Sequence, residues 1–282
     1  MEPGPAKYGI VDGKVRTRAL EYHIVDHCTM RCDQCCSFSP ILKPWFADPG
    51  DFENDLRAAS LAVAPQFLKL VGGEPLLHPE LERLLAIARG LAGGRHIQLT
   101  TNGFLIGRLT PRAWECLDSL TVSLYPEPAL GKERIRFIAR EARARNVAVN
   151  WKVQDKFTML DRTGLASGEE ARATFRECWI RQRCNSIRDG RFYCCTRPQY
   201  IRRFAPDPRP FLDDGIPVGD PDTASLAARI KQHLERTEPL NSCYLCRGGY
   251  APLDTNRQLT ASGVAQKRER MAALCGLIAS RP

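Results

Sequence analysis

The sequence predicts an α/β fold built on a parallel sheet, and two patterns support this. Short apolar runs alternate with amphipathic helical patterns up to about residue 155, which is typical of repeated strand–helix units. The 282 residues, 43% of them hydrophobic, also suffice to bury one large core and a smaller one beside it. We therefore expect the N-terminal part to hold one sheet flanked by helices.

Each element of this sheet has its own local signal. Runs rich in β-branched and aromatic residues predict strands at 19–26, 66–72, 96–102, 120–125 and 147–153. Helical periodicity between them predicts helices at 51–64, 79–92, 110–117 and 131–145. Thr110-Pro111 and His78-Pro79 are good helix starts, because each places a polar residue before a proline in the first turn.

The C-terminal part has a different amino-acid composition. From about residue 176 it is rich in cysteine, and a proline-rich loop at 205–222 follows. Helices are predicted at 223–236 and 262–279. We place a domain boundary near 165–176, which gives an N-terminal domain at 1–170 and a cysteine-rich domain at 171–282.

Composition narrows the cell compartment and the partners. No run approaches about 18 consecutive apolar residues, and the N-terminus lacks the layout of a secretory signal. Twelve cysteines without an export signal favour the reducing cytoplasm, with thiols serving metal or redox chemistry. The net charge of +9 is compatible with an anionic substrate, but no aromatic-interleaved basic motif supports a nucleic-acid partner.

The most informative motif is CTMRCDQC, which contains Cys28, Cys32 and Cys35. Three thiolates at this spacing hold three irons of a [4Fe–4S] cube and leave the fourth iron open to a small ligand. A zinc site usually pairs one CxxC with a second CxxC or with two histidines, and this motif does neither. The motif directly follows the first strand, at the sheet edge where parallel α/β barrels place their sites.

Polar and glycine residues mark the ends of the next strands. The second strand ends in GGEP, where glycines permit close backbone approach and the carboxylate can accept from a cationic amine. The third strand ends in TTNG, and the fourth contains a serine; short polar side chains there suit hydrogen bonds to a ribose or a carboxylate. The alternative is that these are turn residues with local capping bonds. The residues concerned are Gly72, Gly73, Glu74, Thr101, Asn102 and Ser123.

These motifs, in this order, resemble the radical S-adenosylmethionine (radical SAM) enzymes. The resemblance implies a partial (β/α)6 TIM-type barrel, whose sixth strand the sequence does not reveal. It also implies that the open iron binds SAM, that the GGE residues receive the SAM amino group, and that Thr101, Asn102 and Ser123 contact SAM. One departure is Gln34, where the family often has an aromatic residue; Phe38 is the substitute we suggest for packing on adenine.

A second group of cysteines lies around DGRFY, where Asp-Gly predicts a tight turn between two strands. The pattern resembles the Twitch form of the SPASM extension, which carries one auxiliary [4Fe–4S] cluster. The resemblance implies Cys184, Cys195, Cys243 and Cys246 as its ligands, with Cys178 and Cys194 as alternates. A zinc ribbon is the alternative, because a hairpin cysteine pair plus CxxC also describes that site.

The resemblance covers about residues 20–250 and is strongest to bacterial radical SAM enzymes of carbohydrate and secondary metabolism. It implies SAM and two [4Fe–4S] clusters as cofactors, a flavodoxin- or ferredoxin-type electron donor, and a carbohydrate-like small-molecule substrate. We expect a 5'-deoxyadenosyl radical to remove hydrogen from a carbinol carbon. Epimerisation would follow if a cysteine returned a hydrogen atom, with Cys178 and Cys194 as candidate donors. The alternatives are oxidation of the same carbon, as by a dehydrogenase, and modification of a ribosomally made peptide.

Overall fold

The computed structural model describes residues 8–219 and 222–279. One mixed sheet has the order β10 (Ile216–Pro217), β9 (Arg191–Tyr193), β8 (Asn185–Arg188), β2 (Lys14–Val25), β3 (Val63–Gly72), β4 (His96–Thr101), β5 (Ser119–Leu124) and β6 (Ala148–Val153), with β1 (Ile10–Val11) paired to β2. A second sheet pairs β7 (Lys156–Thr158) with β11 (Leu253–Thr255).

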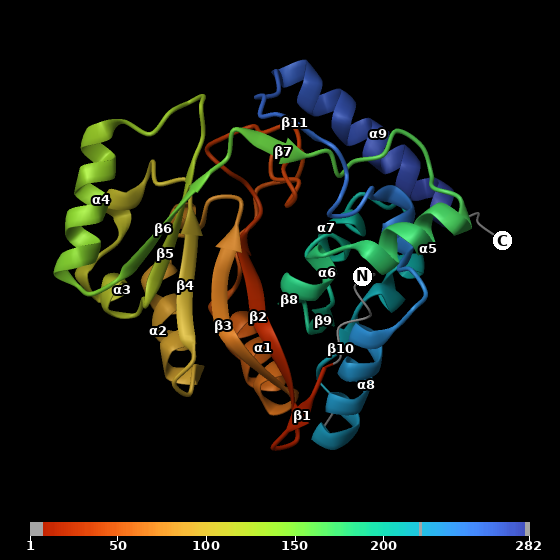
Figure 1. Ribbon diagram of the computed structural model, residues 1–282, viewed down its shortest axis with the longest axis horizontal. Coiled ribbons are helices and arrows are strands. Elements are labelled where there is room, and N and C mark those ends of the chain that lie inside the picture. Colours follow the sequence, from red (N-terminus) through yellow and green to blue (C-terminus); the bar gives the residue numbers. More distant parts are fainter. Residues whose placement is uncertain (1–7, 220–221, 280–282) are drawn as a thin grey trace.

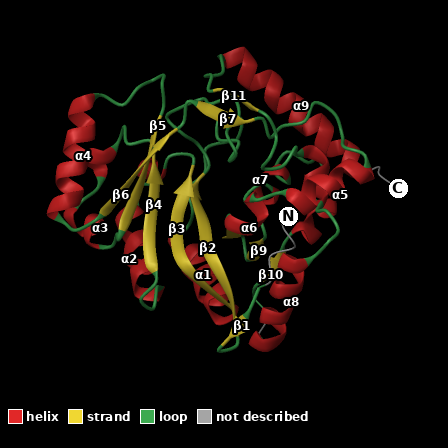
Figure 2. Cartoon of the chain, in the orientation of Figure 1, coloured by secondary structure: helices red, strands yellow, loops and turns green. Residues whose placement is uncertain are grey.

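The helices are α1 (Pro49–Ala62), α2 (Leu81–Leu91), α3 (Pro111–Glu115), α4 (Lys132–Ala144), α5 (Gly168–Glu177), α6 (Ile180–Arg183), α7 (Pro198–Ile201), α8 (Thr223–Glu235) and α9 (Ala261–Ala279). Figure 1 shows β2 to β6 fanning out in chain order, with α4 at one edge and α9 above β7 and β11. Figure 2 shows the strands at the centre and helices around them. None of the helices in the described residues is both long and apolar enough to cross a bilayer.

The parallel part of the sheet contains the five expected strands and one that the sequence did not reveal. Strands β2 to β6 pair in parallel with their neighbours in chain order. The additional parallel strand is β8, which pairs with β2 through Leu20–Asn185, Glu21–Ser186 and Tyr22–Ile187. The structure is thus the expected partial TIM-type barrel, with the cysteine-rich segment contributing a strand beside the first one. The domain division at residue 170 stays a prediction.

Local signals explain where the elements begin. Thr110 caps α3 by accepting from the Ala113 N–H, with Pro111 in the first turn, as expected. Helix α2 begins at Leu81, two residues after the proline of the His78-Pro79 start, because His78 Nδ1 accepts instead from the Glu80 N–H at 3.0 Å. The Asp189-Gly190 turn joins β8 to β9 with positive φ at both residues, as the DGRFY pattern predicted.

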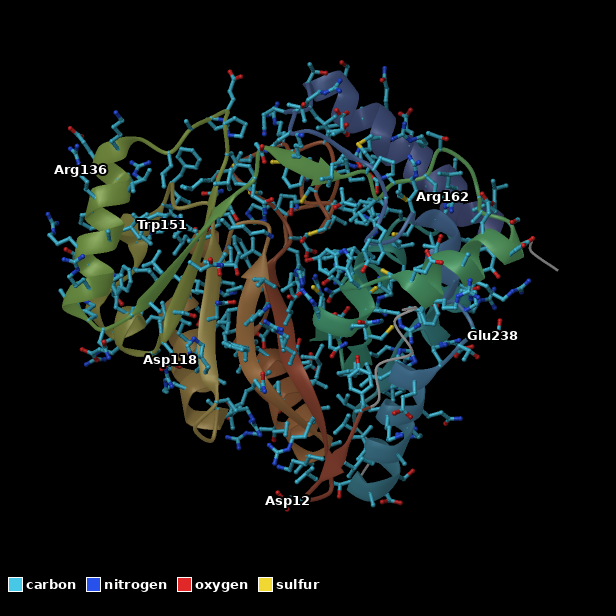
Figure 3. All side chains as sticks on the ribbon, viewed as in Figure 1. Asp12, Asp118, Arg136, Trp151, Arg162 and Glu238 are labelled. Carbon is cyan, nitrogen blue, oxygen red and sulfur yellow. The ribbon has the colours of Figure 1, made fainter. Side chains whose placement is uncertain are left out.

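The two faces of the sheet differ in chemistry. Residues such as Leu70, Leu99 and Leu120 are fully buried and pack against the helices in the larger core. Trp151 on β6 also packs against this core and lies on the side of α4 (Figure 3). Side chains along a strand alternate between the two faces of the sheet, so the face opposite the larger core carries the other residues of each strand. We call this opposite face the inner face. The N-terminus, where we expect no secretory signal, includes residues 1–7, which lie outside the described residues.

A buried ion pair fastens the cysteine-rich segment to the barrel. Arg188 is fully buried and donates to both carboxylate oxygens of Asp26, at 2.5 and 3.1 Å. Its guanidinium lies 3.7 Å from the ring centre of Trp45. Arg203 also donates to Asp26, at 3.2 Å. Removing one member of a buried pair leaves the other charge desolvated without compensation, so this contact holds β8 against β2.

We expect Arg188→Met to lower the free energy of unfolding by about 3 kcal/mol, because Asp26 would keep only the weaker contact with Arg203. Urea unfolding of the reduced, metal-free chain measures this change. Arg209→Met is the matched control, since Arg209 is exposed and its ion pair in the described part of the chain is with Asp207. It should change the free energy by less than about 0.5 kcal/mol. Equal effects of the two substitutions would contradict the role given to Arg188.

Candidate functional site

The loop after β2 brings the three cysteines of the first motif together. Cys32 is buried, and Cys28 and Cys35 are half-buried. Burial raises the pKa of Cys28 to about 12, and the negative charges of Glu74, Cys35 and Cys32 add to the shift. Burial likewise raises the pKa of Cys32 to about 11. Metal ligation favours the thiolate form of Cys28 and Cys32, because a bound cation offsets the burial that raises both pKa values.

The two glycines of GGEP are required by this loop. Gly72 has φ of 148°, and a Cβ on it would lie 2.4 Å from the carbonyl oxygen of Val25. A Cβ on Gly73 would lie 2.1 Å from the carbonyl oxygen of His27. The Gly73 N–H instead donates to Val25 at 2.7 Å, and the Glu74 N–H to His27 at 3.0 Å. The close approach that these glycines permit is therefore first of all to the cysteine loop itself.

Glu74 joins the ends of β3 and β4. Its carboxylate is fully buried and accepts from the Thr101 hydroxyl at 2.7 Å, the Asn102 N–H at 2.8 Å and the Leu76 N–H at 3.1 Å. Burial raises the pKa of Glu74, and these three donors oppose the shift. The Asn102 side-chain amide donates in turn to Cys28 Sγ at 3.7 Å and to Thr29 at 2.9 Å. Glu74, Thr101 and Asn102 thus form one unit with the cysteine loop.

Ser123, near the end of β5, leads to an aromatic residue that the sequence reasoning missed. Burial raises the pKa of Tyr125 well above its usual value, and the negative charges of Cys32, Cys35 and Cys28 raise it further. A hydrogen bond with Ser123 opposes the rise. Tyr125 therefore interacts electrostatically with all three thiols. Phe38 is only 1% exposed and packs against Phe204 and Arg197, which disagrees with the suggestion that it offers its ring to adenine. The SLYP string was the available signal for Tyr125.

Four cysteines from distant parts of the C-terminal half line one cavity. They are Cys178 after α5, Cys195 after β9, and the CYLC pair Cys243 and Cys246. Three of these agree with the ligand set expected from the sequence, and Cys178 was an alternate. No three His, Cys, Asp or Glu side chains in the described residues converge on a point suited to a single metal ion. The four cysteines share the lining of one cavity.

The surroundings of this cavity suit an anionic cluster with thiolate ligands. The Gly249 N–H donates to Cys178 Sγ at 3.3 Å and the Gly248 N–H to Cys246 Sγ at 3.4 Å. Arg197 lines the cavity and is 2% exposed, yet within the described chain its Nε and Nη1 lack hydrogen-bond acceptors. Buried donors without acceptors indicate a missing acceptor. The residues present therefore fit a [4Fe–4S] group at this position.

Cys184 is the exception among the four predicted ligands, because it lies apart from the cavity that the other three line. Instead it ends α6 just before β8, and its thiol interacts electrostatically with Glu21, Lys69 and Lys152. Those residues belong to the inner face, because Glu21 pairs with Ser186 on β8 and with Lys69 on β3. The spacing around DGRFY suggested Cys184, but the helical turn of α6 points it to the other side.

Cys194 is fully buried in the larger core. A side-chain hydrogen bond with Cys195 lowers its pKa, and a hydrogen bond with His233 lowers it further. Cys194 therefore lies outside both the cavity lining and the inner face. Of the remaining thiols, Cys275 is buried in the smaller core, and Cys116 packs at the edge of the larger one. Cys36 follows the cluster loop directly and interacts with Glu21 and Lys152.

The inner face carries many polar side chains, together with apolar residues such as Phe67 and Val71. Glu21 accepts from Thr196 at 3.0 Å, and its carboxylate lies 3.6 Å from Lys69 Nζ and 3.5 Å from His23 Nε2. Burial alone would raise the pKa of Glu21, but the contacts with His23, Lys69 and Thr196 lower it overall. Hydrogen bonds between neighbouring strands continue the pattern through the pairs Gln98–Ser119, His96–Ser119 and Asn150–Thr121. Such a lining suits a hydroxylated or charged molecule.

Comparison with protein families agrees with the N-terminal site. The sequence model of the Radical SAM superfamily matches residues 22–125. This stretch contains the three cysteines, the GGEP turn, Thr101, Asn102, Ser123 and Tyr125. Residues 22–125 thus match the radical SAM domain in sequence.

Curated relatives match the same region. The chain is 33% identical over 124 residues to molybdenum cofactor biosynthesis protein 1 of Mus musculus, covering 43% of this chain and 19% of that protein. It is 36% identical over 115 residues to GTP 3',8-cyclase of Acidothermus cellulolyticus, covering 38% and 32%. The chain thus spans about a fifth to a third of these relatives. They are named as cyclases or cofactor-biosynthesis proteins, and not as the carbohydrate-modifying enzymes whose motifs the chain resembles.

Among solved structures, the chain is similar to BtrN in complex with AdoMet and 2-DOIA, with a TM-score of 0.49 and 15% identity. The match covers 83% of this chain and 94% of that one. A match to SuiB of Streptococcus suis bound to S-adenosylmethionine has a TM-score of 0.32 and 22% identity, over 40% of this chain and 26% of that one.

The cavity predicts which cysteines hold iron. Cys178→Ala should lower the iron of the reconstituted chain from about eight to about four atoms, because it removes one of four thiolates of the auxiliary site. Replacing Cys243 and Cys246 together should have the same effect. Cys184→Ala should leave about eight atoms bound. Iron and sulfide analysis after anaerobic reconstitution measures all three. Loss of iron with Cys184→Ala and not with Cys178→Ala would restore the set expected from the sequence.

Proposed function

We propose that the chain is a radical SAM enzyme that removes a hydrogen atom from a carbinol carbon of a sugar-like small molecule and epimerises that carbon. The observation that carries the proposal is that the cluster loop and the buried Glu74–Thr101–Asn102 unit meet at the C-terminal ends of β2, β3 and β4, on a sheet whose inner face carries polar side chains. A [4Fe–4S] cluster with an open iron supplies one electron to bound SAM, which yields methionine and a 5'-deoxyadenosyl radical.

The residues of the chain have distinct roles in this proposal. Cys28, Cys32 and Cys35 hold the first cluster, and Asn102 orients Cys28 through its amide. The GGE turn, Thr101, Asn102 and Ser123 stay the candidates for binding SAM, with Tyr125 added because it interacts electrostatically with all three thiols. Glu74 already accepts three hydrogen bonds, so it has capacity for one further donor, such as the SAM amino group. The carboxylate thus both fixes the loops and faces the ligand.

The proposed auxiliary cluster is held by Cys178, Cys195, Cys243 and Cys246, beside the buried guanidinium of Arg197. This assignment excludes Cys178 as a hydrogen donor, because a thiolate that binds iron has no S–H bond. Cys194 is excluded by its complete burial in the core. In this proposal neither Cys178 nor Cys194, the two candidate hydrogen donors expected from the sequence, returns hydrogen to the substrate. An electron donor of the flavodoxin or ferredoxin type supplies electrons in this proposal.

Cys184 is the thiol that the inner face offers instead. It lies near Glu21 and Lys69, among the polar side chains that we propose contact the substrate. The 5'-deoxyadenosyl radical takes H from the carbinol carbon, and the Cys184 S–H returns H to the opposite side, which leaves a sulfur radical. One electron from the protein donor and one proton from solvent restore the thiol. The sum consumes one SAM and two electrons for each carbon epimerised.

GTP cyclisation is a second candidate, favoured by the names of the curated relatives. Those matches cover 38–44% of this chain, and the family model matches residues 22–125. The inner face differs from an all-cationic phosphate site, because the carboxylate of Glu21 stands within 3.6 Å of Lys69. A carboxylate there favours a hydroxylated or amino-bearing substrate over a triphosphate. GTP therefore belongs in the substrate panel as the competing outcome.

The reaction is tested by measuring the mass of the product. The reconstituted, reduced enzyme is incubated with SAM in D2O and a panel of aminoglycosides, aminocyclitols, nucleotide sugars and GTP. We expect 5'-deoxyadenosine together with a product one mass unit heavier, because an exchangeable thiol hydrogen enters the substrate. A product two units lighter would show net oxidation by a dehydrogenase. Conversion of GTP alone would favour cyclisation, and no 5'-deoxyadenosine with any substrate would refute the enzyme proposal.

The donor is tested by substitution. Cys184→Ala should abolish the deuterated epimer while 5'-deoxyadenosine continues to form, because hydrogen removal precedes hydrogen return. Cys116→Ala is the matched control, since Cys116 lies at the end of α3 and away from the inner face. It should leave the yield of epimer unchanged. Full deuterium incorporation by the Cys184 variant would show that another group returns the hydrogen.

A further inference from the structure

The C-terminal segment 253–260 crosses the cluster loop, and we call it the strap. It begins with β11, which pairs antiparallel with β7. The strap then bonds to the cysteine loop from both sides: the Asp33 N–H donates to the Arg257 carbonyl at 2.9 Å, and the Leu259 N–H donates to the Arg31 carbonyl at 2.8 Å. A bridge between Cys32 and Gln258 lies between these two bonds. The backbone of the strap is therefore fixed in register with the second cysteine.

Gln258 uses its whole side-chain amide in this position. Its Nε2 donates to Cys32 Sγ at 3.4 Å and to the Glu127 carbonyl at 3.5 Å. Its Oε1 accepts from the Arg31 N–H at 2.7 Å. The opposite orientation of the amide would place its oxygen against the sulfur and its NH2 group against a backbone N–H. The three contacts therefore define which end of the amide faces Cys32.

Helix α9 fastens the strap to the rest of the chain. Lys267 is 5% exposed and lies 3.0 Å from the Asp33 carboxylate and 2.6 Å from that of Asp161. Asp161 also accepts from Arg197 at 2.7 Å. A chain of buried charges thus runs from the cluster loop to the cavity that the four other cysteines line. Because these charges leave the loop and α9 little freedom, the Gln258 amide is held at a fixed distance from the sulfur.

We propose that Gln258 is a positioning residue that raises the reduction potential of the first cluster by donating a hydrogen bond to the Cys32 thiolate. The inference rests on the proposed function, since it assumes that Cys32 binds iron. Reduction adds negative charge to the cluster and its sulfurs, so a donor stabilises the reduced form more than the oxidised form. Asn102 makes the same kind of contact with Cys28, but at 3.7 Å. Cys32 has the shorter contact and a donor that comes from outside the radical SAM domain.

The test compares three variants of the full chain after anaerobic reconstitution. Gln258→Glu keeps the size and the acceptor for Arg31 but replaces the donor with an anion. Gln258→Leu removes both polar ends. Arg257→Ala is the matched control, because Arg257 is the adjacent strap residue and, among residues 8–219 and 222–279, its exposed side chain pairs with Asp254. Because Gln258 lies at the surface, its replacement does not disturb the core.

The readout is a potentiometric titration followed by electron paramagnetic resonance of the signal that changes when SAM is added. We expect both Gln258 variants to show a more negative midpoint, with Gln258→Glu shifted further, and a severalfold smaller reduced fraction at a fixed potential. Arg257→Ala should titrate like the unsubstituted chain. An unchanged midpoint in either Gln258 variant with full iron content would overturn the inference. If Gln258→Glu lost the cluster, Gln258→Leu alone would decide it.

Iron analysis of the unsubstituted chain separates this inference from the proposed function. A chain that binds no iron and sulfide refutes both. A chain that binds both clusters and cleaves SAM, but whose midpoint ignores position 258, keeps the proposed function and loses only the role of Gln258. Cys32→Ala serves as the reference for loss of the first cluster, since it should remove the SAM-sensitive signal.

Discussion

The buried carboxylate of Glu74 is the contact on which the candidate site depends. It accepts from the ends of β3 and β4, while the Gly73 and Glu74 N–H groups donate to the loop that follows β2. Three strand ends are thereby locked to one another by short, buried hydrogen bonds. A buried carboxylate tolerates this environment only while its donors are present. The cysteine loop, the glycine turn and the TTNG turn consequently form one rigid unit.

The second constraint is the parallel pairing of β8 with β2. It extends the barrel sheet with a strand from the cysteine-rich segment, and the buried Arg188–Asp26 pair fixes it there. This pairing divides the cysteines around the hairpin between two environments. Cys195 lies on the cavity with Cys178 and the CYLC pair, whereas Cys184 lies with the polar residues of the inner face. A single hairpin thus contributes to a proposed cluster site and to a proposed substrate site.

The C-terminal strap and α9 connect the two candidate cluster sites. The strap bonds to the loop of Cys32, and Lys267 on α9 pairs with Asp33 beside it and with Asp161, the partner of Arg197. Because Lys267, Asp161 and Arg197 are buried, solvent screens their ion pairs only weakly, and these pairs help to hold the relative positions of the two sites. The geometry around the first motif is therefore completed by residues more than 200 positions later in the chain.

The sequence by itself determined the motif CxxxCxxC, the GGEP and TTNG turns, five parallel strands and the DGRFY hairpin, because local spacing and hydrophobic periodicity encode these features. Tertiary structure alone decided that β8 lies beside β2, that Cys178 replaces Cys184 on the cavity, and that Gln258 reaches Cys32. Each of these depends on contacts between residues far apart in the chain. Cys184 and Cys195 flank the same turn, but which face each one occupies is set by α6 and the sheet register. A polar, non-periodic strap such as 253–260 carries no local signal, since its conformation comes from the loop it binds.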